Sequence, residues 1–239
     1  MGFWKKMLPP LLWKPLNEIR KDHFPNRSVS YSGEGEDLIL AKILHNVSRG
    51  FYIDIGCYHP KLNSNTYYFY RRGWNGINID ANPESIKIFN KLRPRDININ
   101  IGIAENETEL TYYIFNEPAV NTFSQALREE REKISWLKLL DSKKISVRPL
   151  AEVLDAAVVP PVIDFMDIDV EGLDMEVLRS NNWQKYAPRV ILVEDQQTSV
   201  NSFEELETFQ FLSSHDYSLL SKTFSTLIFV HRTFLKELV

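Results

Sequence analysis

The chain has 239 residues, 44% of them hydrophobic and 25% charged, with a formal net charge of −4. This length suits one α/β domain with a large core. The weakly acidic charge argues against nucleic acid as a partner, because such a surface needs clustered Lys and Arg. Cys57 is the single cysteine, which excludes an intrachain disulfide and a cysteine-based zinc site. A reducing, cytoplasmic location is the simplest interpretation.

Residues 1–30 are predicted to form an N-terminal arm that precedes a domain at 31–239. The arm begins MGFWKKMLPPLLW, in which apolar and aromatic side chains are interrupted by Pro9 and Pro10. This run is too short and too broken to span a bilayer or to act as a signal peptide. Three alternatives stay open. The arm packs on the domain, it packs on a partner subunit in a homo-oligomer, or its Trp and Lys side chains rest on a membrane surface.

Strands and helices alternate from residue 31 onward. Short apolar, β-rich runs predict strands at 51–55, 76–80, 97–101, 162–169 and 189–194. Helical periodicity and start signals predict helices at 38–44, 65–72, from Pro83 onward, and at 150–154, 173–179 and 203–213. This alternation is typical of an α/β fold with a doubly wound, mainly parallel sheet.

The middle and the end of the chain depart from this alternation. Residues 109–115 predict an extra strand, and residues 116–144 predict a polar, charged insertion with a helix over 124–140. A short strand at 145–147 follows the insertion. Such an insertion often forms a lid or part of a substrate site. Residues 217–220 and 226–231 predict a C-terminal hairpin.

Ligands of open parallel sheets bind beyond the carboxyl ends of the strands. Gly56 directly follows the first strand and lets a ligand approach the backbone closely. The glycine-rich dinucleotide fingerprint is absent there, which disfavours NAD and leaves a nucleoside without phosphates. Asp80 ends the second strand, where a carboxylate can accept hydrogen bonds from both ribose hydroxyls.

Several long motifs in this order resemble the FkbM-type methyltransferases. They are YSGEGEDLIL (31–40), FYIDIGCYHP (51–60), SNTYYFYRRGWNGINIDANP (64–83), RPRDININIGI (93–103), NTF (121–123) and IDFMDIDVEG (163–172). The resemblance implies a class I methyltransferase fold, which is Rossmann-like with seven strands, S-adenosylmethionine as cofactor, and O-methylation, commonly of sugars or natural products. His59-Pro60 stands where the family often has a further glycine.

The resemblance also implies roles for individual residues. Asp54 and Gly56 would line the methionine end of the cofactor, Asp80 would hold the ribose, Ala81, Asn82, Gly102 and Ile103 would border the adenine, and Asp169 would lie close to the methyl-bearing sulfur. Glu36 and Asp37 would fold over the cofactor, or, as the alternative, oppose the positive end of a helix dipole. Asn65 either caps a helix or reaches the cofactor carboxylate.

Methyl transfer to an alcohol needs a group that takes the hydroxyl proton. His59 is the first candidate for this base, because its ordinary pKa is near neutrality, and Asp169 and Glu171 are its rivals. The same two acids could instead bind a metal ion, yet hard cations take clustered oxygen ligands and no third ligand is obvious. The sequence therefore predicts a site without metal.

A hydroxyl of a sugar is the predicted acceptor, either a small molecule or a glycan such as a surface polysaccharide or glycolipid precursor. Tyrosines near the predicted crevice would suit a sugar; they are Tyr58, Tyr67, Tyr68, Tyr112 and Tyr113. A membrane-surface arm would suit a lipid-linked acceptor. Two rival interpretations are a nucleotide-dependent oxidoreductase, disfavoured by the missing glycines, and a non-catalytic scaffold that kept the fold.

Overall fold

A computed structural model describes residues 28–195 and 203–238. The chain divides into two compact units, residues 1–30 and 31–239, and every element named below belongs to the second. The expectations for the N-terminal arm fall mostly on residues 1–27, which lie outside the described residues. Within the described ranges, no helix has the length and apolar character needed to cross a membrane.

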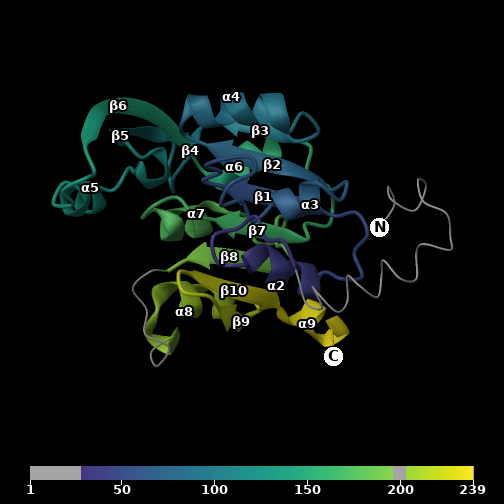
Figure 1. The fold of residues 1–239 in the computed structure, drawn as a ribbon. Coiled ribbons are helices and arrows are strands. Elements are labelled where there is room, and N and C mark those ends of the chain that lie inside the picture. Colours follow the sequence, from purple (N-terminus) through teal and green to yellow (C-terminus); the bar gives the residue numbers. More distant parts are fainter. Residues whose placement is uncertain (1–27, 196–202, 239) are drawn as a thin grey trace, which may run out of the picture. The chain divides into compact units, whose positions relative to one another are not determined.

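The domain is built on the predicted doubly wound, seven-stranded α/β sheet (Figure 1). In spatial order its strands are β3 (Ile97–Asn100), β2 (Asn75–Asp80), β1 (Phe51–Ile55), β7 (Phe165–Ile168), β8 (Val190–Glu194), β10 (Thr226–His231) and β9 (Tyr217–Lys222). The first five are parallel, and β10 pairs antiparallel with both β8 and β9. The C-terminal hairpin is thereby confirmed.

Successive strand residues point to opposite faces of the sheet. Apolar side chains therefore lie on both faces, and helices pack against each of them. Ile53 and Ile55 of β1 belong to a core that also holds side chains of α6 (Leu150–Asp155), α7 (Asp174–Ser180) and α8 (Glu207–Ser214), which follows η4 (Phe203–Glu205). Tyr52 belongs to a second core with α2 (Glu36–Ile43), α3 (Tyr67–Tyr70) and α9 (Arg232–Leu238). Helix α4 (Pro83–Leu92) begins as predicted, with Pro83 in its first turn and Asn82 capping the amide of Glu84.

The prediction of a helix over 124–140 is wrong for most of its length. Helix α5 (Gln125–Arg131) is short, and β6 (Leu139–Arg148) follows as a long strand. Strand β6 pairs antiparallel with β5 (Thr108–Phe115) and parallel with β4 (Gly102–Ile103), which leaves the main sheet just after β3. These three strands and α5 form a separate small sheet and helix beside the main sheet (Figure 1). The turn η3 (Pro118–Val120) joins β5 to α5.

Candidate active site

A pocket opens beyond the carboxyl ends of the central strands, where a parallel sheet places its ligands. Its cavity volume is about 190 Å³. Ten of the thirteen candidate catalytic and cofactor-binding residues line it, namely Asp54, Gly56, His59, Asn65, Asp80, Ala81, Gly102, Ile103, Asp169 and Glu171. Glu36, Asp37 and Asn82 do not line it. Strands β1, β2 and β7 therefore bring most of the predicted site together.

Gly56 allows two backbone segments to pack closely at the floor of this pocket. Its φ is 91°, a conformation that favours glycine, and its amide donates to the carbonyl of Ile79 at 2.9 Å. A Cβ atom here would lie 1.7 Å from the backbone oxygen of Asp169. The loop after β1 can thus pack directly on the residue that follows β7.

Asp80 presents its carboxylate at the end of β2. Its Oδ1 accepts a hydrogen bond from the amide of Asn82 at 2.5 Å, and its Oδ2 takes none from the described residues. Burial raises the pKa of Asp80 to about 7. The hydrogen bond from Asn82 opposes this rise, and the charge of Asp54 adds to it. An acid so placed can accept from ribose hydroxyls. Asn82 itself caps α4.

Glu36 and Asp37 lie in the first turn of α2, and both are buried. Asp37 accepts hydrogen bonds from the Tyr31 amide at 2.7 Å and the Ser32 hydroxyl at 3.1 Å. Glu36 accepts from the Glu34 amide at 2.9 Å. These contacts favour the helix-terminus alternative for both acids over direct cover of a ligand.

Asn65 does not cap a helix. Its Nδ2 donates to Oδ2 of Asp167 at 2.9 Å, and Asp167 stands beside Asp54 in the register of β7 and β1. Burial first, and then the charge of Asp54, raise the pKa of Asp167 well above its usual value. Asp167 lines the pocket as well, so the floor carries two neighbouring acids.

The His59 ring is bonded in a way that argues against its role as the base. Its Nδ1 accepts hydrogen bonds from the amides of Lys61 at 3.1 Å and Leu62 at 3.0 Å. The neutral ring then carries its proton on Nε2 and has no free nitrogen to take another. Burial and the charge of Lys61 also lower the pKa of His59. The alternative, a loop histidine bonded to backbone, fits these contacts.

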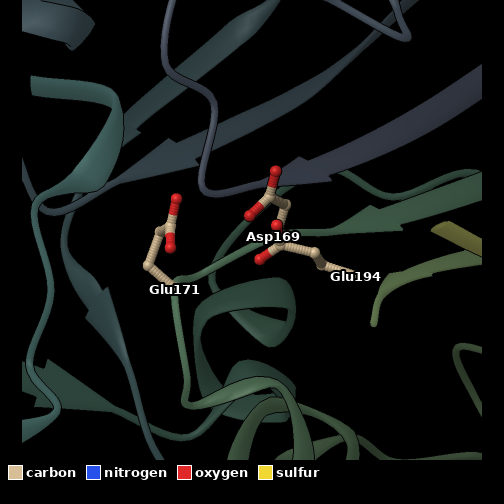
Figure 2. Close-up of side chains that lie close together, drawn as sticks. All are labelled: Asp169, Glu171 and Glu194. Carbon is tan, nitrogen blue, oxygen red and sulfur yellow. The ribbon is translucent and has the colours of Figure 1, made fainter. Parts of the chain in front are cut away.

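Three carboxylates lie close together (Figure 2), and two of them, Asp169 and Glu171, line the pocket. Asp169, Glu171 and Glu194 each offer an oxygen within 4.8 Å of the others. Glu194 is the third acid; the sequence places it at a strand end but does not indicate it as a ligand, because it lies more than twenty residues after Glu171. The side chain of Asp169 is exposed to the open pocket, yet the protein packed around it and the charges of Glu194 and Glu171 raise its pKa well above the usual value.

Arg131 of α5 is a site residue that the sequence did not reveal. Its guanidinium forms an ion pair with Glu171 and donates to the carbonyl of Val120 at 2.7 Å. Glu171 has a φ of 56°, and its carbonyl accepts from the Thr122 hydroxyl at 2.6 Å. The insertion is thereby tied to the turn after β7. Burial and the charge of Glu194, opposed by Arg131, raise the pKa of Glu171 to about 7.

Aromatic side chains form part of the pocket wall. Tyr58, Tyr112 and Phe123 line it, and the Tyr58 hydroxyl donates to Glu117 at 3.2 Å. The other three predicted tyrosines do not line it, and each lies against other groups: Tyr67 against Tyr31, Tyr68 against Arg72 and Tyr113 against Arg128. Phe123 comes from the insertion, so part of the predicted substrate segment does reach the pocket.

The sequence of residues 54–219 matches the methyltransferase FkbM domain. The chain belongs to the FkbM methyltransferase family. It is an S-adenosylmethionine-dependent methyltransferase, and family membership decides against the oxidoreductase and scaffold alternatives. No curated protein matches the chain.

Two solved structures resemble this FkbM-family methyltransferase. A candidate O-methyltransferase from Klebsiella pneumoniae is 10% identical, with a TM-score of 0.39, over 95% of this chain and 92% of that one. A TehB-like S-adenosylmethionine-dependent methyltransferase from Corynebacterium glutamicum is 12% identical, with a TM-score of 0.39, over 91% of this chain and 96% of that one. At these values neither structure adds to the family assignment.

The residues that line the pocket fit the family's cofactor in their charge. S-adenosylmethionine supplies a methyl group on a positively charged sulfur, and its methionine end carries an ammonium group. Asp80 would hold the ribose hydroxyls, Asp54 and Asp167 would face the ammonium group, and Asp169 lines the same pocket. Gly56 removes the Cβ that would separate β1 from β7.

Proposed function

We propose that this enzyme transfers the methyl group to a hydroxyl oxygen of a sugar, in a surface polysaccharide, a glycolipid or one of their precursors. The observation that carries the proposal is the open carboxylate of Asp169. It lines the pocket and is exposed to it, and the charges of Glu194 and Glu171 raise its pKa, so it takes a proton more readily than an isolated Asp. Such a group suits an alcohol, whose oxygen must lose its proton.

The charge of the pocket supports an uncharged acceptor. Among the described residues that line it, five are acidic, Asp54, Asp80, Asp167, Asp169 and Glu171, and none is Lys or Arg. An anionic acceptor would be repelled by these carboxylates. Tyr58, Tyr112 and Phe123 offer apolar faces, and the two tyrosines add polar tips, which suits a sugar ring.

Asp169 takes the hydroxyl proton in this proposal, and Glu171 orients the acceptor. Glu171 is already paired with Arg131, which neutralises its charge, whereas the charges that act most strongly on Asp169 are those of Glu194 and Glu171. The enzyme would work in the cytoplasm. It would lie at the membrane surface through its N-terminal arm where the acceptor is lipid-linked.

A panel of acceptors with radiolabelled S-adenosylmethionine tests the proposal. We expect label to enter neutral glycans and lipid-linked sugars, and to enter glycans rich in uronic acids much less. Folded protein, nucleic acid and a small phenol serve as the other arms. Transfer to any of these three, with none to glycans, would refute the sugar assignment.

Replacement of His59 by Asn should leave turnover within about tenfold of wild type, because His59 is not the base in this proposal. Loss of a general base would instead lower turnover by about 10²–10⁴-fold. The Asn side chain can keep an acceptor for the amides of Lys61 and Leu62. Steady-state rates between about pH 6 and 9 measure the effect. A loss above about 100-fold, with the acid limb of the pH profile removed, would restore His59 as the base.

A further inference from the structure

A buried arginine, Arg93, contacts the pocket lining and has no assigned role. Arg93 follows α4 and is fully buried. Its Nε forms an ion pair with Asp96 at 2.8 Å, its Nη2 donates to the Tyr52 hydroxyl at 2.7 Å, and its Nη1 donates to the Thr66 hydroxyl at 2.9 Å. A buried guanidinium is costly unless its donors are satisfied, and these contacts satisfy most of them.

The hydrogen bonds from Arg93 to the pocket have a fixed direction. A guanidinium only donates, so Thr66 must accept from Arg93. The hydroxyl of Thr66 has one hydrogen, and Oδ2 of Asp54 lies 2.7 Å away and accepts it. The chain of donors therefore runs from Arg93 through Thr66 to Asp54, from the covered face of the sheet toward the pocket.

Asp54 is the end of this chain and part of the pocket floor. Its Oδ1 accepts no hydrogen bond from the described residues, so one oxygen is held by Thr66 and the other is left for a ligand. Arg93 already shares its charge with Asp96. The floor consequently keeps an excess of negative charge, which suits a positively charged ligand group.

We propose that Arg93 and Thr66 are positioning residues for the cofactor: they fix the rotamer of Asp54 and keep its carboxylate charged, ready for the ammonium group at the methionine end. This inference rests on the proposed function, because it needs Asp54 at that end of S-adenosylmethionine. It deepens the assignment by naming two residues outside the loop after β1 on which the site depends.

The charges around Asp54 explain why such support is needed. Burial raises the pKa of Asp54, and the charge of Arg93 and the hydrogen bond from Thr66 oppose that rise. Other acids face it from neighbouring elements: Asp96 after α4, Asp80 at the end of β2 and Asp167 on β7, with Glu36 of α2 acting on Asp167. The charge of Asp54 also helps to raise the pKa of Cys57, in the loop after β1.

A purely structural role for the same network makes a different prediction. The network also ties Tyr52 of β1 and Asn78 of β2 to Asp96, and could serve only to hold the strands and α4 together. Its loss would then weaken ligand binding by one factor at every pH. A positioning role makes the loss depend on pH, because an unsupported Asp54 becomes protonated more easily.

Replacement of Thr66 by Val tests the proposal with nearly the same side-chain shape. Binding of S-adenosylhomocysteine is measured by calorimetric titration at about pH 6 and about pH 8.5. We expect an affinity at least about tenfold below wild type at the lower pH, as expected for one bond to a charged group, and within about threefold at the higher. Thr66→Ser, which keeps the hydroxyl, should match wild type at both.

Thr208→Val is the matched control, because Thr208 lies on α8, outside the pocket lining, and its hydroxyl donates to the sulfur of Met175 on α7; this variant should bind as wild type does. Thr66→Ala provides a second loss of the hydroxyl with less steric demand. Wild-type protein that does not bind the ligand contradicts the proposed function. Binding by wild type together with a Thr66→Val affinity that is unchanged, or reduced equally at both pH values, overturns the positioning role alone.

Discussion

Replacement of Asp169 by Asn is expected to lower turnover by about 10²–10⁴-fold, the usual contribution of a general base, while the affinity for S-adenosylhomocysteine stays within about tenfold. The amide of Asn cannot take the proton of the acceptor hydroxyl, yet it keeps the shape of the side chain. The backbone amide of residue 169 still donates to the carbonyl of Ile55 at 3.0 Å, so the floor stays in place. Single-turnover rates and calorimetric titration measure the two effects.

Asp155→Asn serves as the control for this variant. Asp155 ends α6, where it pairs with Lys185, and it does not line the pocket. Its replacement should change neither rate nor affinity. If Asp169→Asn instead kept turnover and lost ligand binding, Asp169 would be a binding residue, and Glu171 would become the remaining candidate for the base.

Activity in the presence of EDTA decides whether the three acids hold a metal ion. We expect activity to survive EDTA, because Arg131 already neutralises Glu171, and a cation would have to compete with it. Loss of activity in EDTA, with recovery in Mg²⁺ or Mn²⁺, would contradict the prediction. Asp169, Glu171 and Glu194 would then be the ligands, since their oxygens lie within 4.8 Å of one another.

The main sheet could be predicted from sequence because each of its strands is signalled locally. Short runs such as Phe51–Ile55 and Val190–Glu194 are apolar apart from one acid each. The insertion could not, because Ile134, Leu137 and Leu140 recur at helical spacing. Residues 139–148 instead form a ladder with β5 over eight residue pairs. Tertiary pairing overrides the local pattern.

The site was predictable where a motif lies at the end of one strand. Gly56, Asp80 and Asp169 are of this kind, and all line the pocket. Residues that act across the fold were missed for a physical reason: Arg131 reaches Glu171 from forty residues away, and Arg93 reaches Thr66 from twenty-seven. No local spacing encodes such contacts. They exist only once α5 and α4 pack beside the sheet.

Replacement of Asp80 by Asn should weaken cofactor binding and stabilise the unliganded protein at the same time. Loss of hydrogen bonds from the ribose hydroxyls to a charged group should cost roughly 1.5–3 kcal/mol of binding free energy, about 10- to 100-fold in affinity. Calorimetric titration with S-adenosylhomocysteine measures this change. Unaltered affinity in a folded variant would contradict the role of Asp80.

The gain in stability follows from the pKa of Asp80, which the fold raises from 3.8 to about 7. The native state binds this proton more tightly than the unfolded chain, so the free energy of unfolding falls as pH rises through this window. Asp80→Asn removes that loss. At about pH 8 its unliganded melting temperature should exceed that of wild type, by about 2–4 °C for each kcal/mol in a domain of this size. The difference should vanish near pH 4.

Asp141→Asn, at an exposed acid whose pKa Lys143 lowers, should give no such gain. A melting temperature for Asp80→Asn at or below wild type at pH 8 would show that the carboxylate is not held at the expense of stability.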